Sequence, residues 1–441
     1  MRAHLSNAAY GILDYGAYPI GMLVVAPIVL RNLGLSQYGV WTFATAAVSI
    51  GGIVASGFGD ANIQHVASRR GANDEHAALQ AVRSMMGINL AFGVALACAG
   101  WVLSPLAASR VAGPNTVLQY SCLWSLRIAS LLMAVRAVES VCIGTQRAFE
   151  RYGAAVRISI LGRILALVAA AVLTYAGHSV IEIMAATGLL MLVALWLQIA
   201  DLKRLLSADS LMPAFDRETM RSLAGFGVFS MLQAVSGVVF GQLDRMMLGV
   251  SLGAAVVASY SLCAQMAQPI FGFAAAGLHF LFPYLSKRNA SSSTTSIKNF
   301  VLIAFACNLI FVALTTCILL SFGVRIMRVW VGSAVVQAAA PVLPIIIWSS
   351  ALLGMNVTAT YALLALGRVR IVTWFNLLGG AAMLILMMDL TPSLGVQGMA
   401  IARLGYGIVP LFLYVPLLRH LLGKRASHAG VSTLQTVREG L

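Results

Sequence analysis

The sequence has 441 residues, of which 60% are hydrophobic and only 10% are charged. Soluble domains contain about one charged residue in four, so this composition excludes a soluble globular protein and predicts a membrane protein. The net charge of +15 is spread over many short segments instead of one basic stripe, which excludes a nucleic-acid-binding protein. Apolar runs recur from end to end, unlike the single short run of a secretory signal.

Twelve apolar runs are each long enough to cross a bilayer, since about 20 helical residues match a hydrocarbon core of about 30 Å. Helices are expected because backbone polar groups facing lipid must bond within their own segment. In chain order the runs span about residues 8–30, 37–60, 82–107, 117–142, 154–176, 179–200, 222–247, 254–283, 297–321, 336–364, 370–389 and 396–420.

Basic residues are distributed unevenly over alternate loops. One set of loops holds 20 Lys and Arg, and the other holds five, namely Arg31, Arg110, Arg245, Arg325 and Arg328. Because cytoplasmic loops carry the excess of Lys and Arg, both termini are predicted to be cytoplasmic. This distribution also accounts for the large positive net charge.

Two pairs of short segments resemble each other. "LGLSQYGVWTFATA" from Leu33 is echoed by "LGVSLGAAVVASYSLCAQ" from Leu248, and "GTQRAFERYGAAVRIS" is echoed by "LLALGRVRIVTWFN". Chance similarity is the alternative for such short matches. Both pairs join equivalent spans in the same orientation, which predicts two six-helix halves related by an axis along the membrane normal. The first pair predicts that Leu33 and Leu248 are equivalent positions of the two halves.

The predicted fold is therefore an all-α integral membrane protein with 12 transmembrane helices in two lobes and a pseudo-twofold repeat around a central cavity. We expect an N-terminal lobe at residues 1–205, a cytoplasmic linker at 206–221, a C-terminal lobe at 222–422 and a cytoplasmic tail at 423–441.

Polar residues follow one face of the first two spans in each half, at helical steps of three and four. They are Asn7, Tyr10, Asp14, Tyr18 and Gly21; Thr42, Thr45, Ser49, Gly52, Ser56 and Asp60; Ser230, Gln233, Gly237, Gly241 and Asp244; and Ser261, Gln265, Gln268 and Gly272. Close helix packing explains the small residues and hydroxyls. Asp14 and the three glutamines need partners or water, which favours a water-filled space between the lobes.

Several arginines also lie within spans. Arg136 and Glu139 are three residues apart and can form a structural ion pair. Arg127 is nine positions from Arg136, on the opposite helix face, so it needs another counter-charge or an anionic ligand. For Arg163 and Arg403 the alternative is snorkelling or bonding to backbone carbonyls.

The six cysteines all fall inside predicted spans and show no CxxC or Cys/His spacing. Neither a metal site nor a disulfide framework is therefore expected.

Six segments together resemble the Wzx-type polysaccharide flippases of the MOP (multidrug/oligosaccharidyl-lipid/polysaccharide) exporter superfamily. They are "RNLGLSQYGVWTF", "SGFGDANIQHVASRRG", "QLDRMMLGVSLGAAVVASYSLCAQ", "LFPYLSKR", "RVWVGSAVVQAAAPVLPIIIW" and "LGVQGMAIA". No single motif is diagnostic, but the similarity runs in order along nearly the whole chain.

The resemblance implies a transporter without enzymatic activity. Such flippases move undecaprenyl-pyrophosphate-linked oligosaccharide repeat units from the cytoplasmic to the periplasmic leaflet of the bacterial inner membrane, by alternating access. The product is an O-antigen, capsule or exopolysaccharide. The implied partners are the lipid-linked substrate, membrane lipids, and the polysaccharide polymerase with its chain-length machinery. No cofactor is implied beyond H⁺ or Na⁺ coupling.

The resemblance also implies roles for residues of this chain. The candidates for binding the pyrophosphate are Arg127, Arg136, Arg163, Arg403 and Arg31, although Arg31 fits interface anchoring equally well. The candidates for contacting sugars are Tyr10, Tyr18, Gln233, Gln265 and Gln268. Asp14 is expected to be either a proton-coupling site or a counter-ion to an arginine, and Asp60, Glu139 and Asp244 share these two alternatives.

Three other functions fit the sequence less well. A multidrug or cation antiporter of the same superfamily needs an acidic cavity, whereas arginines outnumber carboxylates within these spans. Lipid II flippases have basic residues in the first span and usually fourteen spans, but this chain has no arginine between Arg2 and Arg31. A ligase or polymerase needs a large soluble loop, and the predicted loops here are short.

Overall fold

The computed structural model describes residues 2–71, 74–149, 151–208, 210–215, 236–278 and 294–420, with the single positions Leu232, Leu281 and Leu285. Every regular element in these ranges is a helix. Seven helical segments are long and apolar enough to cross a membrane, and two of the longest contain two predicted spans each. The predicted all-α membrane fold is confirmed.

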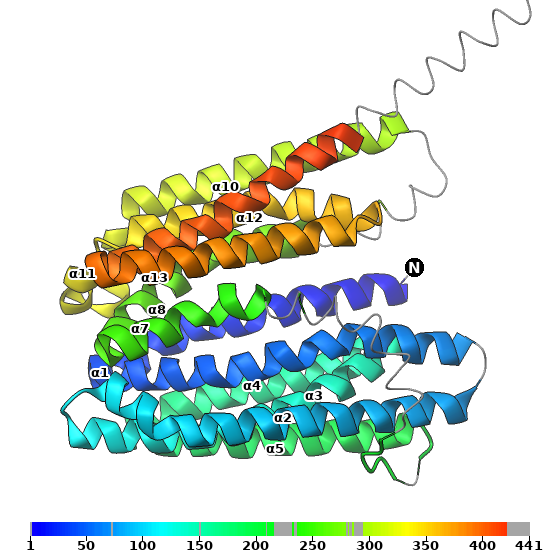
Figure 1. Ribbon diagram of the computed structural model, residues 1–441, viewed down its shortest axis with the longest axis horizontal. Helices are drawn as coiled ribbons and strands as arrows, with labels where there is room; N and C mark the ends of the chain where they lie inside the picture. The colour runs from blue at the N-terminus through cyan, green and yellow to red at the C-terminus, as the bar shows by residue number, and fades with distance from the viewer. Residues whose placement is uncertain are drawn as a thin grey trace, which may run out of the picture.

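The N-terminal half consists of five helices. They are α1 (Arg2–Gly71), α2 (Glu75–Ala112), α3 (Thr116–Ala148), α4 (Tyr152–Tyr175) and α5 (Val180–Leu205). The first two predicted spans both lie in α1, which turns at Gly34 with φ 78°. Figure 1 shows the two parts of α1 running in opposite directions from this turn.

The C-terminal half repeats this plan with more irregular helices. Its elements are η1 (Val239–Leu243), α7 (Asp244–Leu252), α8 (Ala254–Leu278), α10 (Thr294–Val331), α11 (Ser333–Ala339), α12 (Leu343–Ala365), α13 (Val369–Ile408) and η2 (Val409–Leu413). The last two predicted spans both lie in α13 and its continuation, and α13 turns at Gly395. The π-helical η1 and the 3-10 helical η2 interrupt the seventh and twelfth spans.

Six glycines with positive φ occur in pairs that reveal the repeat. The pairs are Gly34 with Gly253, Gly113 with Gly332, and Gly177 with Gly395, and the separation along the chain is nearly constant. Gly34 and Gly253 have nearly the same backbone angles, with φ 78° and ψ 168° against φ 88° and ψ 172°. Only glycine adopts such angles without strain, so the two halves turn at equivalent places.

The pseudo-twofold repeat is thus confirmed, but the predicted register between the halves is wrong. The segment "LGVSLG" contains two Leu-Gly pairs, and the prediction matched Gly34 with Gly249 instead of with Gly253. Gly249 lies inside α7, whereas Gly253 forms the turn. The equivalent positions therefore lie one helical turn further along the C-terminal half.

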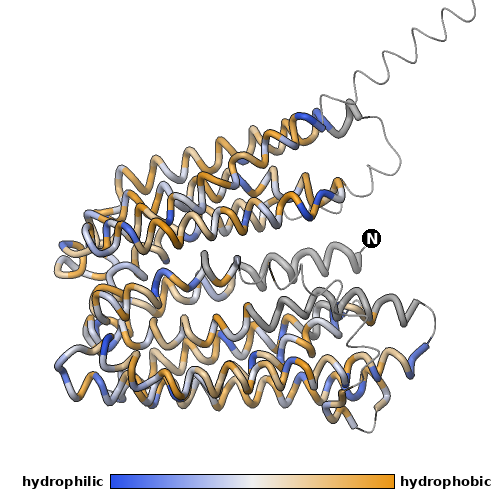
Figure 2. Tube along the Cα trace, viewed as in Figure 1, coloured by the Kyte–Doolittle hydropathy of each residue, from blue (hydrophilic) through white to orange (hydrophobic). Residues whose placement is uncertain are grey.

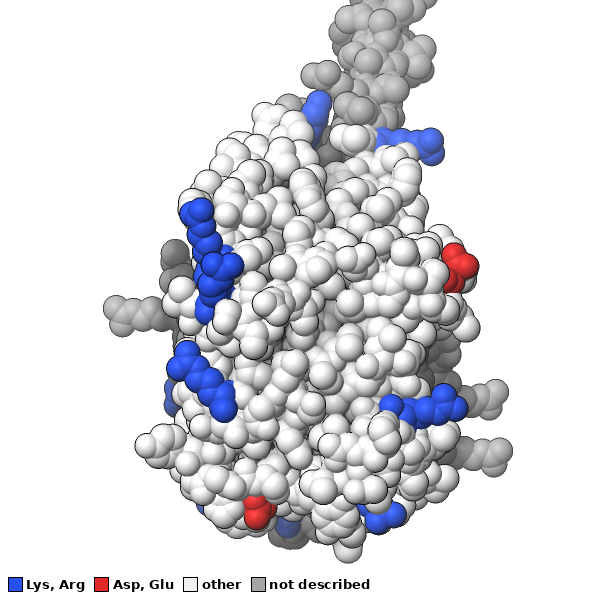
Figure 3. All heavy atoms as spheres, turned by 90° about the vertical axis from the view of Figure 1, so that its left-hand side faces the viewer, with Lys and Arg blue, Asp and Glu red and all other residues white. Residues whose placement is uncertain are grey.

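The two halves form two bundles that meet along α1 and α8. Figure 1 shows them approaching each other at the end that holds the six glycine turns, named here the convergent end, and diverging toward the N-terminus. Hydrophobic residues dominate the helices of both bundles (Figure 2). In Figure 3, which views the convergent end, uncharged residues cover the middle and charged side chains lie toward the margin.

Glycines permit the close approach of α1 and α8. A Cβ on Gly39 would lie 1.9 Å from the Ala254 carbonyl oxygen, and a Cβ on Gly249 would lie 2.4 Å from Cε2 of Phe43. The Tyr38 side chain of α1 accepts a hydrogen bond of 3.2 Å from Gln265 of α8. The two halves are therefore in backbone contact near the convergent end.

The first part of the predicted linker lies against the N-terminal bundle. Arg83 of α2 donates from Nε to the Met212 carbonyl at 3.0 Å, and the Ala214 amide donates to the Arg83 carbonyl at 3.0 Å. A Cβ on Gly87 would lie 2.4 Å from the Ala214 carbonyl oxygen. Helix α5 ends at Leu205. The predicted domain boundaries stay predictions, and those near residues 221 and 422 lie outside the described residues.

Candidate functional site

Three arginines from both halves of the chain lie within electrostatic range of one tyrosine. The Tyr18 hydroxyl of α1 lies within the electrostatic field of Arg136 of α3, Arg245 of α7 and Arg163 of α4. These four residues, named here the arginine cluster, come from both halves of the chain. Tyr18, Arg136 and Arg163 are among the predicted site residues, and the structure brings them together.

Small residues allow the helices that carry the arginine cluster to pack closely. A Cβ on Gly21 would lie 2.8 Å from Cδ1 of Leu167, so α1 and α4 touch about one turn away from Tyr18 and Arg163. On the other part of α1, a Cβ on Gly51 would lie 2.6 Å from Cβ of Met133 on α3. Gly21 of the polar stripe thus permits close helix packing, as expected, and Gly51, which lies next to the stripe residue Gly52, does the same.

Hydrogen bonds orient each guanidinium of the cluster. Arg136 pairs through Nη1 with Glu139 Oε2 at 2.7 Å, which is the ion pair expected from their spacing. Arg163 donates from Nη2 to Ser159 Oγ at 2.6 Å, and Arg245 donates from Nη1 to Gln242 Oε1 at 3.5 Å.

Glu139 is the carboxylate paired with Arg136, and it also accepts a hydrogen bond of 3.4 Å from Gln198 of α5. Three arginines against this carboxylate leave a net positive charge among the described residues of the cluster. Arg136 keeps 24% of its side-chain surface exposed despite the ion pair. Because guanidinium groups form forked bonds to phosphate oxygens, the cluster is suited to an anionic ligand that carries phosphate.

Sequence reasoning did not select Arg245 as a site residue. It placed this arginine at the outer end of the seventh span, where interface anchoring and ligand contact were both open. In the structure the π-helical turn of η1 ends directly before Asp244. Such a turn holds an additional residue and changes the direction of the side chains that follow. The signal available in the sequence was the polar stripe that ends at Asp244, one residue earlier.

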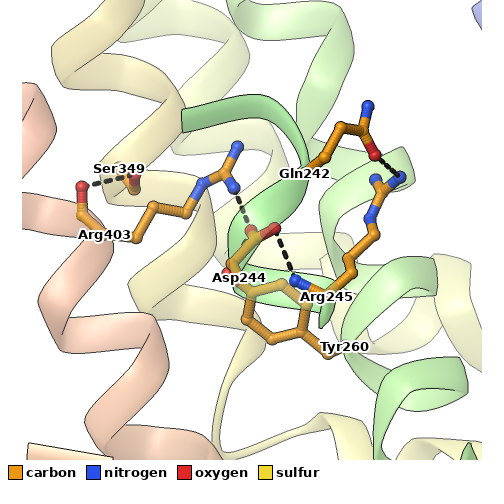
Figure 4. Close-up of polar contacts among 6 residues, drawn as sticks. All are labelled: Gln242, Asp244, Arg245, Tyr260, Ser349 and Arg403. Carbon is orange, nitrogen blue, oxygen red and sulfur yellow. Dashed lines mark hydrogen bonds and ion pairs between the residues drawn. The ribbon is translucent and has the colours of Figure 1, made fainter. Parts of the chain in front are cut away.

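A second network, buried and charge-neutral, lies beside the cluster (Figure 4). Arg403 of α13 forms an ion pair with Asp244 of α7, and the side chains are 11% and 1% exposed. Tyr260 of α8 donates its hydroxyl to Asp244 Oδ2 at 2.8 Å, and the Arg245 amide donates to Oδ1 at 2.7 Å. The network ties α7, α8 and α13 together. Arg403 is thus held by a carboxylate outside the arginine cluster, and Asp244 is its counter-ion.

Arg127 and Arg31 do not join the cluster either. The guanidinium of Arg127 lies over the rings of Trp101 and Trp124, at 4.9 and 5.0 Å from their centroids. This position follows from the helix, since nine residues turn Arg127 to the side of α3 opposite Arg136. Arg31 is exposed, three residues before the turn at Gly34.

The remaining predicted residues have different outcomes. Gln265 is buried against Tyr38, so it joins the two bundles instead of lining an open space. Gln268 is exposed on α8. Tyr10, Asp14 and Asp60 lie in α1, but their side chains are outside the described part, as is Gln233. The roles predicted for these four residues stay predictions.

A cavity of about 170 Å³ lies inside the C-terminal bundle, between α8, α12, α13 and η2. Its polar lining includes Asn356, which donates to the Gly407 carbonyl at 2.8 Å, and Tyr406, whose hydroxyl contacts Ser236 Oγ at 3.2 Å. In the described ranges, no three His, Cys, Asp or Glu side chains are grouped to hold a metal ion.

Residues 5–289 match the family described as polysaccharide biosynthesis protein. The chain belongs to this family. The predicted resemblance to Wzx-type flippases of the MOP superfamily is confirmed by this match together with the fold. A search of curated proteins gives no match.

Several solved structures share the fold of this polysaccharide biosynthesis protein. An inward-facing multidrug resistance MATE family transporter of the MOP superfamily matches with a TM-score of 0.75 and 16% identity, over 94% of this chain and 99% of that chain. The lipid II flippase MurJ, in an inward closed conformation, matches with a TM-score of 0.74 and 13% identity, over 93% and 87%. An outward-facing MATE transporter gives a TM-score of 0.58 with 17% identity, over 94% and 97%.

Proposed function

We propose that this polysaccharide biosynthesis protein is a flippase for undecaprenyl-pyrophosphate-linked oligosaccharide repeat units. It moves them from the cytoplasmic to the periplasmic leaflet of the bacterial inner membrane, for synthesis of a surface polysaccharide. The observation that carries the proposal is the arginine cluster, in which three arginines from both halves lie within electrostatic range of Tyr18 and Glu139 pairs with Arg136. The family match supports the saccharide part of the cargo.

The chemistry of the cluster fits the head group of such a cargo. A pyrophosphate entering the space between the bundles loses water, and forked bonds from arginines offset that loss. Arg163 and Arg245 lie on helices of different halves, so one pyrophosphate can be bound by both bundles at once. The prenyl tail stays in lipid, where it loses no apolar contact. Tyr18 supplies a hydroxyl and an aromatic face to the sugar nearest the phosphate.

The arrangement of the two bundles supports transport by alternating access. We take the diverging end as cytoplasmic, because the loops rich in Lys and Arg lie there. The better fit to the inward-facing than to the outward-facing MATE structure supports a cytoplasm-facing state. Opening the α1–α8 contact while closing the opposite end exposes the cluster to the other leaflet.

The proposal is tested with protein reconstituted into vesicles that contain a fluorescent prenyl-pyrophosphate oligosaccharide. Movement between leaflets is read by quenching with a membrane-impermeant reagent, and a fluorescent cationic drug is assayed in parallel. We expect the saccharide lipid to move and the drug to stay. Arg325→Gln, at an exposed position of α10 outside the cluster, is the control and keeps the wild-type rate. Movement of the drug alone overturns the proposal.

In this proposal Asp14 couples transport to H⁺ or Na⁺. The alternative is that Asp14 is a counter-ion to an arginine. The vesicle assay separates the two when the H⁺ and Na⁺ gradients are varied independently. Asp14→Asn is expected to remove the dependence of the rate on one gradient. An unchanged rate at every gradient rejects the coupling role.

A further inference from the structure

Arg127 occupies the lipid-facing side of the N-terminal bundle. The exposed large hydrophobic residues of the first half of α3 are Val117, Tyr120 and Leu131, which are 70%, 60% and 56% exposed. Together with Trp124 they follow helical steps of three and four that include Arg127. The opposite side of α3 carries Arg136 and the cluster. Arg127 therefore lies outside the transport site proposed above.

Two tryptophans hold this arginine in place. Its guanidinium carbon lies 4.9 Å from the centroid of Trp101 on α2 and 5.0 Å from that of Trp124, one turn earlier on α3. Tyr120 packs edge-on against Trp124, with 6.3 Å between the ring centroids. Cation–π contacts attract the charge but leave the N–H donors, which lie in the guanidinium plane, without acceptors.

The donors of Arg127 lack acceptors among the described residues. Its Nε is buried and has no hydrogen-bond partner in that part of the chain. The carboxylates buried within the bundles there, Glu139 and Asp244, pair with Arg136 and Arg403. A charged side chain at membrane depth is costly and normally has a partner.

The side chain is directed toward the nearer membrane surface. Arg127 lies about three helical turns from the start of α3 at Thr116, which places its Cα about 16 Å from the convergent end. Helical side chains point toward the N-terminus of their helix, and the contact with Trp124 brings the guanidinium about 5 Å closer to that end. The guanidinium therefore lies about 11 Å from the convergent end, on the side from which a lipid phosphate approaches.

The repeat provides an internal comparison. When the register that pairs Gly34 with Gly253 is applied, Trp101, Trp124 and Arg127 correspond to Leu320, Leu343 and Ile346. All three counterparts are apolar, so the C-terminal half is built at these places without a charge or an aromatic ring. The Arg127 group is therefore specific to the N-terminal half and is not required by the common helical plan.

We propose that Arg127, held by Trp101 and Trp124, binds the phosphate of an anionic lipid on the outer surface of the α2–α3 hairpin. The phosphate comes either from a membrane lipid headgroup or from a prenyl phosphate. The guanidinium donates to the phosphate oxygens, and the acyl or prenyl chain lies along the exposed apolar stripe of α3.

The test uses the whole protein in nanodiscs of phosphatidylcholine with increasing fractions of phosphatidylglycerol or, separately, undecaprenyl phosphate. The thermal unfolding midpoint is measured against the lipid fraction. We expect the wild type to be stabilised, and Arg127→Leu to need at least about tenfold more anionic lipid, as loss of a charge-assisted bond requires. Arg127→Leu places an apolar side chain on the exposed apolar stripe of α3, and the equivalent position of the other half holds the apolar Ile346, so the variant is expected to fold.

Two further variants complete the design. Arg110→Leu removes an exposed arginine near the end of α2 and is expected to keep the wild-type lipid response. Trp124→Leu keeps the charge but releases it from the ring, and is expected to fall between wild type and Arg127→Leu. A response to phosphatidylglycerol assigns the site to headgroups, and a response to undecaprenyl phosphate alone assigns it to prenyl lipids. Equal responses of wild type and Arg127→Leu to both lipids overturn the proposal.

Discussion

Gly39→Ala is expected to open the convergent end. The added methyl group would lie 1.9 Å from the Ala254 carbonyl oxygen, and this neighbour is backbone that cannot rotate away. Helices α1 and α8 therefore have to separate. Overpacking of this kind costs about 1–3 kcal/mol, which lowers the population of the closed contact by roughly 5- to 150-fold.

The change is measured by cysteine labelling in a background without the native cysteines. Ser259 is 4% exposed and lines a cavity of about 150 Å³ beside Leu35 and Tyr260, near the convergent end. A cysteine at this position reacts with a membrane-impermeant maleimide only when the contact opens. The labelling rate is expected to rise in proportion to the population of the open state.

The control is Gly272→Ala on α8, where a Cβ would meet no atom within 4 Å. Alanine is the better helix former by about 1 kcal/mol, so this variant is expected to be neutral or slightly more stable, with unchanged labelling. If Gly39→Ala also labels at the wild-type rate, the α1–α8 contact is not what closes this end, and the reasoning from the glycine contact is refuted.

Three more predictions concern the arginine cluster, the buried ion pair and one glycine turn. Arg163→Gln and Arg245→Gln are each expected to slow flipping of the saccharide lipid about tenfold or more, because each removes a charge-assisted bond, while the unfolding temperature stays near that of wild type. Asp244→Asn leaves Arg403 buried without its counter-charge and is expected to cost about 3–5 kcal/mol; thermal unfolding should show the loss, and adding Arg403→Met should restore most of it. Gly253→Ala forces a side chain into φ 88°, which costs about 1–3 kcal/mol and should appear as a lower unfolding midpoint, whereas an unchanged midpoint means that the turn relaxes.

The helical plan of this chain could be predicted because span length and hydrophobicity are local properties. The polar stripes of the first two spans also fixed which face of α1 carries Tyr18. The ion pair of Arg136 with Glu139 was predictable for the same reason, since three residues on a helix determine a distance.

Contacts between distant segments could not be predicted in this way. Asp244 and Arg403 are 159 residues apart, and nothing in either local sequence identifies the other as its partner. The two rings that contact Arg127 lie on different helices. The sequence therefore predicted the side of α3 on which Arg127 lies, but not these contacts. Arg245 was not selected because counting in steps of three and four assumes a regular α-helix. A single π-helical turn changes the direction of the side chains that follow it.

The neutral network explains why the arginine cluster keeps its positive charge. Asp244 precedes Arg245 directly, and a carboxylate so close to a guanidinium normally lowers its attraction for other anions. Here Arg403 and the Tyr260 hydroxyl both bind Asp244, so the charge of this carboxylate is balanced from the side of α8 and α13. Arg245 therefore remains a net cation within the arginine cluster. In the function proposed above, the buried pair thus contributes to the selection of an anionic cargo without touching it, as long as Arg403 remains in place.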